Sequence, residues 1–292
     1  AVRELIKAGA DVKARNIFLS LAAAKPIPAE ICYYLGKTYY SLSQMDSARY
    51  YFNLGKTSLD KYGAYNCAGL GKLLLDGNKV AEAKINFDKA LELAPKDVRT
   101  YILIADAYVH AKNKNASQAL ALLNKAMELE KKNTDVYLMM GDAHLLSIEG
   151  GGKAMTNYEN AIDINPKLAK AYCKIGQLYF NARNYDESLK AFQQGIAADS
   201  AYIPIYRELG ELCYSTKRFG KARDAYSKYI SLSDYDVQVQ TRYAYILFLS
   251  KDYPNVIITI NQIIQKDSSN TILSRLIGYS YYEQGKFEDG KK

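Results

Sequence analysis

The chain has 292 residues, of which 49% are apolar and 24% charged, so it holds enough apolar sequence for a sizeable core and is not a disordered chain. Its apolar residues never run for the roughly 18 positions that a membrane-spanning helix needs, and no charged start is followed by an apolar core and a small-residue cleavage site. The formal charge of +8 is spread along the chain without a block of five like charges, whereas a nucleic-acid binder usually gathers its basic residues on one face.

The expected elements are pairs of amphipathic helices that recur with a period near 34 residues. A partial copy over residues 1–28 holds a second helix only, with marker residues Ala14, Phe18, Leu21 and Pro26. Complete copies begin near residues 29, 64, 98, 134, 169, 203 and 237, and a last partial copy covers residues 271–292. We predict a single array over residues 1–292. Because the ends of such an array need covering, we expect a longer natural protein, or a partner or second copy on the ends.

The clearest copy runs from Ala171 to Ser200 and shows the spacing that predicts each helix pair. Its marker positions are Tyr172, Ile175, Gly176, Tyr179, Ser188, Phe192 and Gly195. Steps of three and four residues keep a set on one helix face, and the longer step between the two sets contains a turn at Asn184. The glycine of the first helix recurs in most copies, where its small size is expected to let neighbouring helices approach closely.

These positions resemble the tetratricopeptide repeat, whose pattern is W-x2-L-G-x2-Y, then A-x3-F, then P. The resemblance covers essentially the whole chain, with Tyr or Cys where the family usually has Trp. It implies an all-α fold: an α-solenoid of antiparallel helix pairs that forms a right-handed superhelix. It also implies that the first helix of each pair lines the concave side, where an extended peptide or a partner's helix docks.

The stretch SIEGGGKAMT, from Ser147 to Thr156, is a candidate phosphate-binding loop, because glycines before a helix can present backbone N–H groups to an anion. A nucleotide-binding P-loop must follow a strand, and this stretch instead separates the two helices of one copy. We therefore predict a turn in which Gly150 to Gly152 adopt conformations that other residues adopt poorly, with Lys153 starting the next helix.

The remaining candidates form no catalytic or metal-binding constellation. No C-x2-C spacing occurs, three of the four cysteines occupy buried repeat positions, and Cys173 points elsewhere. Free thiols are expected because Cys32 and Cys67, at equivalent positions of adjacent repeats, should lie about 8–10 Å apart, too far for a disulfide. His144 takes a position that Tyr usually fills, which favours a packing role, and His110 has no obvious partner. The sequence thus predicts a protein that is not an enzyme and that holds no metal or cofactor.

The resemblance implies which residues face the concave groove. Towards the start of the array they are basic, then acidic, then mixed, and at the end they are aromatic with one Arg. The predicted binding residues are Lys37, Tyr40, Lys72, Asp106, Asp142, Gln177, Arg207, Glu211, Tyr245, Phe248, Arg275, Tyr279 and Tyr282.

A groove of mixed charge suits a protein ligand, so we predict a non-enzymatic scaffold that binds a peptide or a partner helix. The alternatives are an RNA-binding helical-repeat protein and the targeting arm of an enzyme whose catalytic domain lies outside this chain. Acidic groove residues make nucleic acid a disfavoured partner. Tyr33 with Lys37 and Ile102 with Asp106 do not match the carboxylate clamp of chaperone-binding relatives. A cytoplasmic and an exported, periplasmic location both stay open, as does the oligomeric state.

Overall fold

The computed structural model describes residues 11–22, 26–234, 236–266 and 271–291, and over these residues it consists of α-helices and one short 3-10 helix, without a strand. The helices are α2 (Asp11–Leu21), α3 (Ala29–Ser41), α4 (Met45–Gly55), α5 (Lys61–Asp76), α6 (Val80–Leu93), α7 (Val98–His110), α8 (Ala116–Leu129), α9 (Thr134–His144), α10 (Gly151–Ile164), α11 (Ala169–Asn181), α12 (Tyr185–Ala198), α13 (Pro204–Ser215), α14 (Phe219–Leu232), α15 (Val237–Leu249), α16 (Tyr253–Lys266), α17 (Thr271–Glu283) and η1 (Asp289–Lys291). No helix in these ranges is long and apolar enough to cross a membrane.

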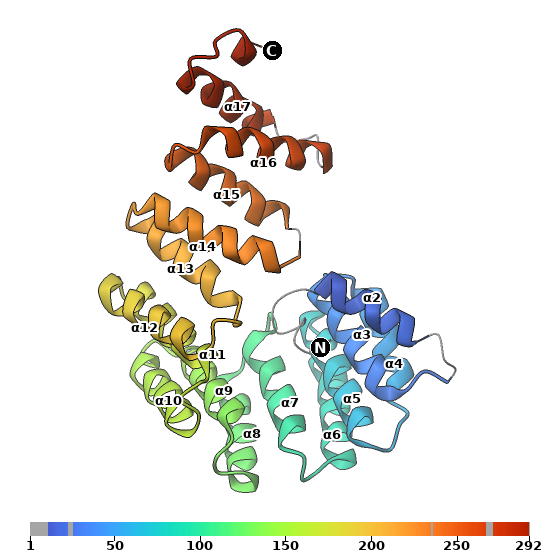
Figure 1. The fold of residues 1–292 in the computed structure, drawn as a ribbon. Coiled ribbons are helices and arrows are strands. Elements are labelled where there is room, and N and C mark those ends of the chain that lie inside the picture. Colours follow the sequence, from blue (N-terminus) through green and yellow to red (C-terminus); the bar gives the residue numbers. More distant parts are fainter. Residues whose placement is uncertain (1–10, 23–25, 235, 267–270, 292) are drawn as a thin grey trace.

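The helices pack as antiparallel pairs, and the pairs stack in chain order from α2 to α17 (Figure 1). Each pair from α3 with α4 to α15 with α16 makes its most extensive contacts internally. In most pairs the second helix then packs against the first helix of the next pair, whereas α7 packs against the preceding pair mainly through α5. This arrangement confirms the predicted all-α solenoid of antiparallel helix pairs in a right-handed superhelix. The superhelix brings distant segments together: the Val12 N–H, at the start of α2, donates a hydrogen bond of 2.6 Å to the Asp234 carboxylate, beyond α14.

Close contact within five of the described pairs depends on a glycine in the first helix and an aromatic ring in the second. A Cβ atom at these glycines would lie closer than 3.0 Å to a ring atom, a distance that real Cβ atoms essentially never show. The facing residues are Gly36 with Phe52, Gly71 with Phe87, Gly141 with Tyr158, Gly176 with Phe192, and Gly210 with Tyr226. The predicted role of these glycines in close helix approach is therefore confirmed.

The turns inside several pairs contain a residue in the left-handed conformation that is not glycine. The φ angles lie between 58° and 63° at Ser43, Asn78, Arg183, Lys217 and Lys251. In the turn between α11 and α12, the Arg183 N–H donates to the Phe180 carbonyl and the Asn184 N–H to the Tyr179 carbonyl. These two bonds satisfy carbonyl groups that the end of α11 would otherwise leave without partners.

Because a left-handed φ costs a residue with a Cβ about 1 kcal/mol and glycine almost nothing, we expect Arg183→Gly to raise the free energy of unfolding by about 0.5–1 kcal/mol. Urea denaturation measures this change. Arg183→Ala is the control, since it removes the exposed side chain but keeps the Cβ. Equal stability of the two variants would show that the gain does not come from the backbone conformation.

The glycine run lies between two helices as predicted, but its predicted conformation is wrong. Gly150 has φ −75° and ψ −12°, an ordinary helical conformation, and α10 already begins at Gly151 rather than at Lys153. A Cβ atom at Gly150 would collide with the His144 carbonyl, whereas one at Gly151 or Gly152 would meet nothing within 4 Å. Close approach to the end of α9, and not a left-handed φ, is what requires glycine at position 150.

All four cysteines are buried free thiols, which confirms the expected free state. The prediction that Cys173 points elsewhere is wrong: its side chain is 3% exposed and packs with Phe192, Ile205 and Leu212. Burial raises the pKa of the Cys173 thiol to about 12, so this group is held protonated and unreactive.

Candidate functional site: the inner groove

A hollow of about 310 Å³ lies on the inner side of the first five complete pairs. With one exception, Phe52, its lining residues come from the first helices α3, α5, α7, α9 and α11. Five predicted binding residues line it: Lys37, Tyr40, Lys72, Asp106 and Asp142. Tyr33, which the repeat pattern places in the groove together with Lys37, also lines it. The pattern did not single out four further polar residues of the lining: Ser41, Arg99, Asp135 and Lys170.

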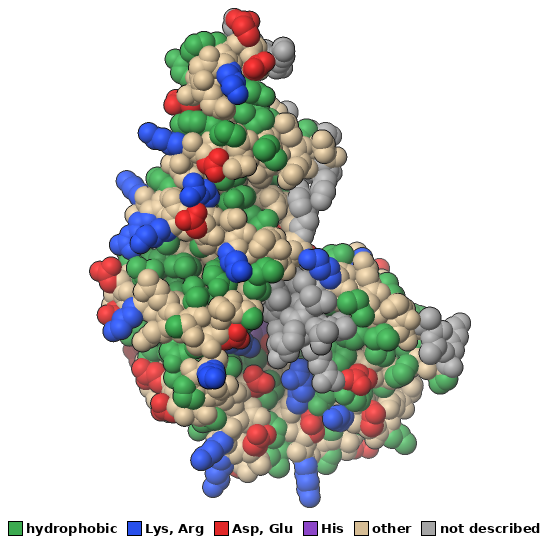
Figure 2. All heavy atoms as spheres, viewed as in Figure 1, with side chains coloured by type: hydrophobic (Ala, Val, Ile, Leu, Met, Phe, Trp, Pro, Cys, Tyr) green, Lys and Arg blue, Asp and Glu red, His purple; other side chains and the backbone are tan. Residues whose placement is uncertain are grey.

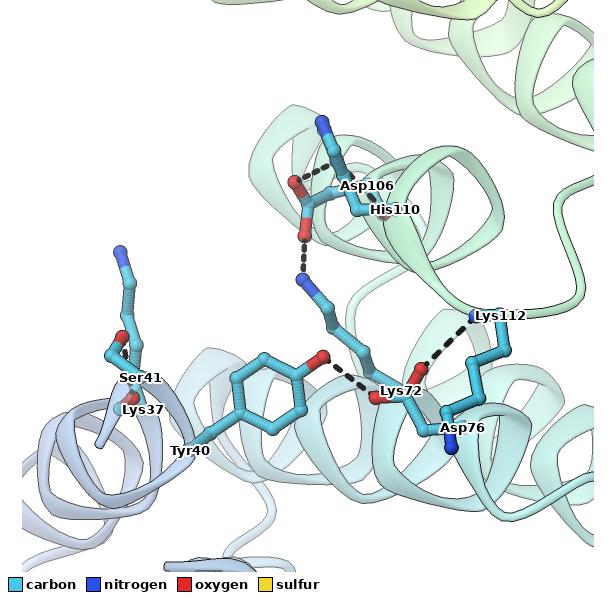
Figure 3. Close-up of polar contacts among 8 residues, drawn as sticks. All are labelled: Lys37, Tyr40, Ser41, Lys72, Asp76, Asp106, His110 and Lys112. Carbon is cyan, nitrogen blue, oxygen red and sulfur yellow. Dashed lines mark hydrogen bonds and ion pairs between the residues drawn. The ribbon is translucent and has the colours of Figure 1, made fainter. Parts of the chain in front are cut away.

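Lys72 and Asp106 form an ion pair across neighbouring repeats (Figure 3). Lys72 Nζ lies 2.6 Å from Asp106 Oδ2, and His110 Nδ1 lies 2.9 Å from Asp106 Oδ1. Burial alone would raise the pKa of Asp106, but the hydrogen bond from His110 and the charge of Lys72 hold it well below its ordinary value. The prediction that His110 lacks a partner is therefore wrong, because the helical spacing of four residues brings it to Asp106.

Tyr40 is fixed beside this ion pair. Its hydroxyl donates a hydrogen bond of 2.6 Å to Asp76 Oδ2, and Asp76 Oδ1 accepts one of 3.2 Å from the Lys112 backbone N–H. Lys72 Nζ lies 5.0 Å from the centre of the Tyr40 ring, within the range of a cation–π interaction. These contacts place both side chains at fixed positions on the inner surface (Figure 3).

Lys37 differs from Lys72 because its ammonium group forms no hydrogen bond or ion pair with any residue that the structure describes. Figure 3 shows its side chain standing apart from the Lys72–Asp106 pair. Burial, together with the nearby positive charge of Arg99, lowers the pKa of Lys37 below its ordinary value. Lys37 and Arg99 therefore place positive charge in this hollow that no carboxylate of the described residues contacts in an ion pair.

Further along the groove, most of the predicted charges pair with other residues of the chain. Asp142 accepts a hydrogen bond of 2.7 Å from the Tyr158 hydroxyl and lies 3.0 Å from Lys174 Nζ. Arg207 pairs with Glu208 at 2.8 Å. Gln177 and Glu211 line a second hollow, of about 280 Å³. The predicted change from basic to acidic residues is thus largely neutralised by pairs along the groove.

Glu211 joins three successive helices. Arg242, from α15, binds it through two hydrogen bonds of 3.0 and 2.7 Å, and the hydroxyl of Tyr226, from α14, donates to the same carboxylate. The Arg242 guanidinium also lies 3.9 Å from the centre of the Tyr214 ring. Burial would raise the pKa of Glu211, but the hydrogen bonds from Arg242 and Tyr226 hold it below its ordinary value.

The last predicted residues lie in two different settings. Arg275, Tyr279 and Tyr282 line a third hollow, of about 880 Å³, beside η1, and the two tyrosines are 60% and 62% exposed. Tyr245 is exposed, whereas Phe248 is half-buried against the core of the last repeats, and neither lines any of the three hollows. The described residues contain no cluster of three or more side chains suited to a metal ion.

Asp106→Asn is expected to lower the free energy of unfolding by about 1 kcal/mol at pH 7, because it removes the charge that Lys72 contacts in a half-buried position. The folded-state pKa of Asp106 is depressed, so its stabilising effect is present above the unfolded-state value near 4 and is lost as the pH falls. The stability gap between the native protein and the variant should therefore shrink below about pH 4.

Denaturation curves of both proteins between pH 3 and pH 7 measure that gap. Asp88→Asn is the matched control, because Asp88 pairs with Lys84 on an exposed helix face and should contribute little. A gap for Asp106→Asn that does not depend on pH would contradict the assignment of its effect to the carboxylate charge.

The chain is similar to known repeat proteins in sequence and in fold. One family model described as a TPR repeat matches residues 152–182, and two described as tetratricopeptide repeats match residues 64–97 and 173–237. No curated protein matches the chain.

Three solved structures illustrate the similarity of fold. The thermophilic TPR protein TTC0263 of Thermus thermophilus is 20% identical, with a TM-score of 0.52 over 63% of this chain and 99% of that one. Yeast Tom70 is 15% identical, with a TM-score of 0.62 over 90% of this chain and 57% of its own. IFIT1 with Gppp-AAAA is 14% identical, with a TM-score of 0.60 over 96% of this chain and 65% of its own. This chain therefore spans little more than half the length of Tom70.

Proposed function

Because this chain belongs to the tetratricopeptide repeat family, we propose that it is a non-enzymatic scaffold whose inner groove binds a peptide segment or a helix of a partner protein. Tetratricopeptide repeats in general support a role in protein interaction. The observation that carries the finer proposal is the 310 Å³ hollow, which five successive repeats build from their first helices.

The chemistry of this hollow suits a polypeptide. Charged residues alternate with apolar ones, including Ile102, Leu138 and Met139, so a ligand must offer both apolar and polar contacts. Tyrosine adds contact area and a hydroxyl at low entropic cost, and Tyr40 is already fixed by its hydrogen bond to Asp76. Such a surface favours a peptide or a helix over a ligand that is uniformly charged.

RNA is a weaker candidate. The carboxylates of Asp106, Asp135 and Asp142 line the same hollow and would repel a phosphate backbone. On the face shown in Figure 2, basic and acidic side chains are interspersed rather than gathered into one basic patch. The solved IFIT1 structure holds Gppp-AAAA, but its 14% identity relates the two chains by fold alone.

The proposal is tested by capturing partners from native cells with the intact chain and measuring their binding to purified variants. Lys37→Glu is expected to weaken the binding of a groove ligand at least about tenfold, because it reverses a charge that forms no ion pair with an acid among the described residues. Lys125→Glu, on an exposed face of α8, is the control with the same charge change. A double variant, Lys72→Asp with Asp106→Lys, keeps an ion pair but reverses its direction, so it tests the groove without leaving a lone charge.

Partners that bind all these variants equally would refute the use of the groove. Binding that survives protease treatment, disappears with ribonuclease and weakens steeply with salt would instead establish an RNA ligand.

A further inference from the structure

Tyr33 lines the 310 Å³ hollow, and its hydroxyl is buried. Its side chain is 3% exposed, and its hydroxyl has no hydrogen-bond partner of acceptable geometry in the structure. The ring packs at 5.1 Å from Tyr34 and 5.3 Å from Tyr65, measured between ring centres, so it is held in this orientation. Folded proteins rarely leave a buried hydroxyl unpaired, because the lost hydration costs free energy.

Two cations that form no ion pair among the described residues line the same hollow: Arg99, whose charge acts on that hydroxyl, and Lys37, which lies near Arg99. The Arg99 guanidinium acts on the Tyr33 hydroxyl through its charge and as a hydrogen-bond donor, so it lowers the pKa of Tyr33, which burial raises, and its carbon lies 6.0 Å from the centre of the Tyr65 ring. Lys37 experiences the charge of Arg99 and, more weakly, those of Asp106 and Asp11, yet neither cation forms an ion pair among the described residues. By contrast, Lys72 in the same hollow is paired with Asp106.

Among the described residues, no carboxylate forms an ion pair with Lys37 or Arg99, and the Tyr33 hydroxyl next to Arg99 donates no hydrogen bond to any acceptor. We propose that Tyr33, Lys37 and Arg99 form a subsite for the side-chain carboxylate of a Glu or Asp residue in the bound partner segment. A carboxylate accepts hydrogen bonds at two oxygens, and its bonds to charged donors and to a hydroxyl are stronger than neutral ones. This inference rests on the proposed function, because it specifies what the groove ligand must carry.

A single carboxylate fits the local charge better than a phosphate group does. One negative charge compensates Lys37 and Arg99 in part, whereas a phosphate carries nearly two and would also face Asp106 and Asp135 across the same hollow. The subsite differs from a clamp for a chain terminus, since it uses one tyrosine hydroxyl and two cations from α3 and α7. An acidic side chain within a longer segment is therefore the predicted ligand group.

The test uses N-acetyl-glutamate N-methylamide as a probe, its glutamine counterpart as the neutral control, and inorganic phosphate as the alternative anion. Binding to the full isotope-labelled chain is followed by NMR. The glutamate probe is expected to shift the signals of residues 33, 37 and 99 and to bind more tightly than the other two probes. Its dissociation constant should lie in the millimolar range, as for other ligands of this size.

Two variants separate binding from stability. Tyr33→Phe should weaken the glutamate probe about tenfold while the melting temperature stays unchanged or rises, because the change removes a hydroxyl that is unpaired in the free protein. Lys37→Met should also weaken the binding of the glutamate probe. Tyr50→Phe and Lys125→Met repeat the same substitutions at exposed positions outside the hollow and should leave binding unchanged.

Equal binding of the glutamate and glutamine probes would overturn the proposal, as would tighter binding of phosphate or a lowered melting temperature of Tyr33→Phe without weaker binding. These outcomes are distinct from a failure of the proposed function. If a captured partner depends on the groove but the glutamate probe does not bind, only the carboxylate subsite is wrong.

Discussion

Phe192→Ala is expected to lower the free energy of unfolding by about 3–5 kcal/mol, the range for removing a buried aromatic ring. Phe192 is 1% exposed and lies against the backbone of Gly176, the residue that lets α11 and α12 approach closely. The reverse change, Gly176→Ala, places a Cβ within 3.0 Å of that ring and should cost about 1–3 kcal/mol through overpacking. Both changes disturb the same contact from opposite sides.

A double-mutant cycle tests whether the two residues act through that contact. Phe192→Leu makes room for the new methyl group, so Gly176→Ala should cost less in the Phe192→Leu background than in the native protein. Gly152→Ala is the control, because this helical glycine has nothing within 4 Å of an added Cβ and should gain up to about 1 kcal/mol.

The measurement is hydrogen exchange together with urea denaturation, since repeat arrays can unfold in parts. The loss of protection should be largest in α11, α12 and the helices that contact them. Additive costs in the cycle, or a Gly152→Ala variant as unstable as Gly176→Ala, would show that the glycine–ring contact is not what limits the size of residue 176.

The glycine–ring contacts were predictable from the sequence because they follow from helical periodicity alone. A glycine and a ring that recur at fixed positions of most pairs, as Gly176 and Phe192 do, must face each other once two helices pack antiparallel. The same regularity placed Lys37, Lys72 and Asp106 on the inner face, where the structure has them. Helical periodicity predicts on which face of a helix a residue lies, and for these residues the face alone was sufficient to place them on the inner side.

The sequence did not predict the contacts that depend on side-chain length and on the path of the backbone. Periodicity does not determine that Lys72 reaches Asp106 while Lys37 stays unpaired, because long side chains select partners from the neighbouring repeats. It also gives no sign of the unpaired Tyr33 hydroxyl, which depends on how Tyr34 and Tyr65 hold the ring.

The backbone of the turns was equally hard to predict. Arg183 is left-handed because packing of α11 on α12 requires a sharp reversal, and this requirement overrides the ordinary preference of the residue. Gly150 is helical because the chain there passes close to His144, which no local pattern indicates. In both turns tertiary packing determines the conformation.

Glu211→Gln is expected to lower the free energy of unfolding by about 2 kcal/mol. The carboxylate binds Arg242 through two hydrogen bonds and accepts a third from Tyr226, so the change removes the charge that all three bonds share. The cost should stay below the roughly 3–5 kcal/mol of a fully buried pair, because the side chains of Glu211 and Arg242 are 30% and 38% exposed and solvent screens them.

A second cycle with Arg242→Met identifies the source of that cost. In the native background Glu211→Gln leaves the Arg242 guanidinium without its carboxylate partner. The Arg242→Met background has no guanidinium, so Glu211→Gln should lower the free energy of unfolding markedly less there. Tyr226→Phe is the matched variant for the third hydrogen bond, since it keeps the ring against Gly210 and removes only the hydroxyl. An unchanged cost of Glu211→Gln in the Arg242→Met background would contradict a coupling between the two charges.

The effect should also reach the shape of the groove, because Glu211, Tyr226 and Arg242 lie on α13, α14 and α15 and connect two successive repeats. Repeats in such an array contact mainly their neighbours, so a weaker contact at one interface lets the repeats on either side move relative to each other. Hydrogen exchange of Glu211→Gln should therefore rise at the α13–α15 contact and stay unchanged in α3 to α7. A rise spread evenly over the whole array would instead indicate that the network stabilises the solenoid globally and does not set its local curvature.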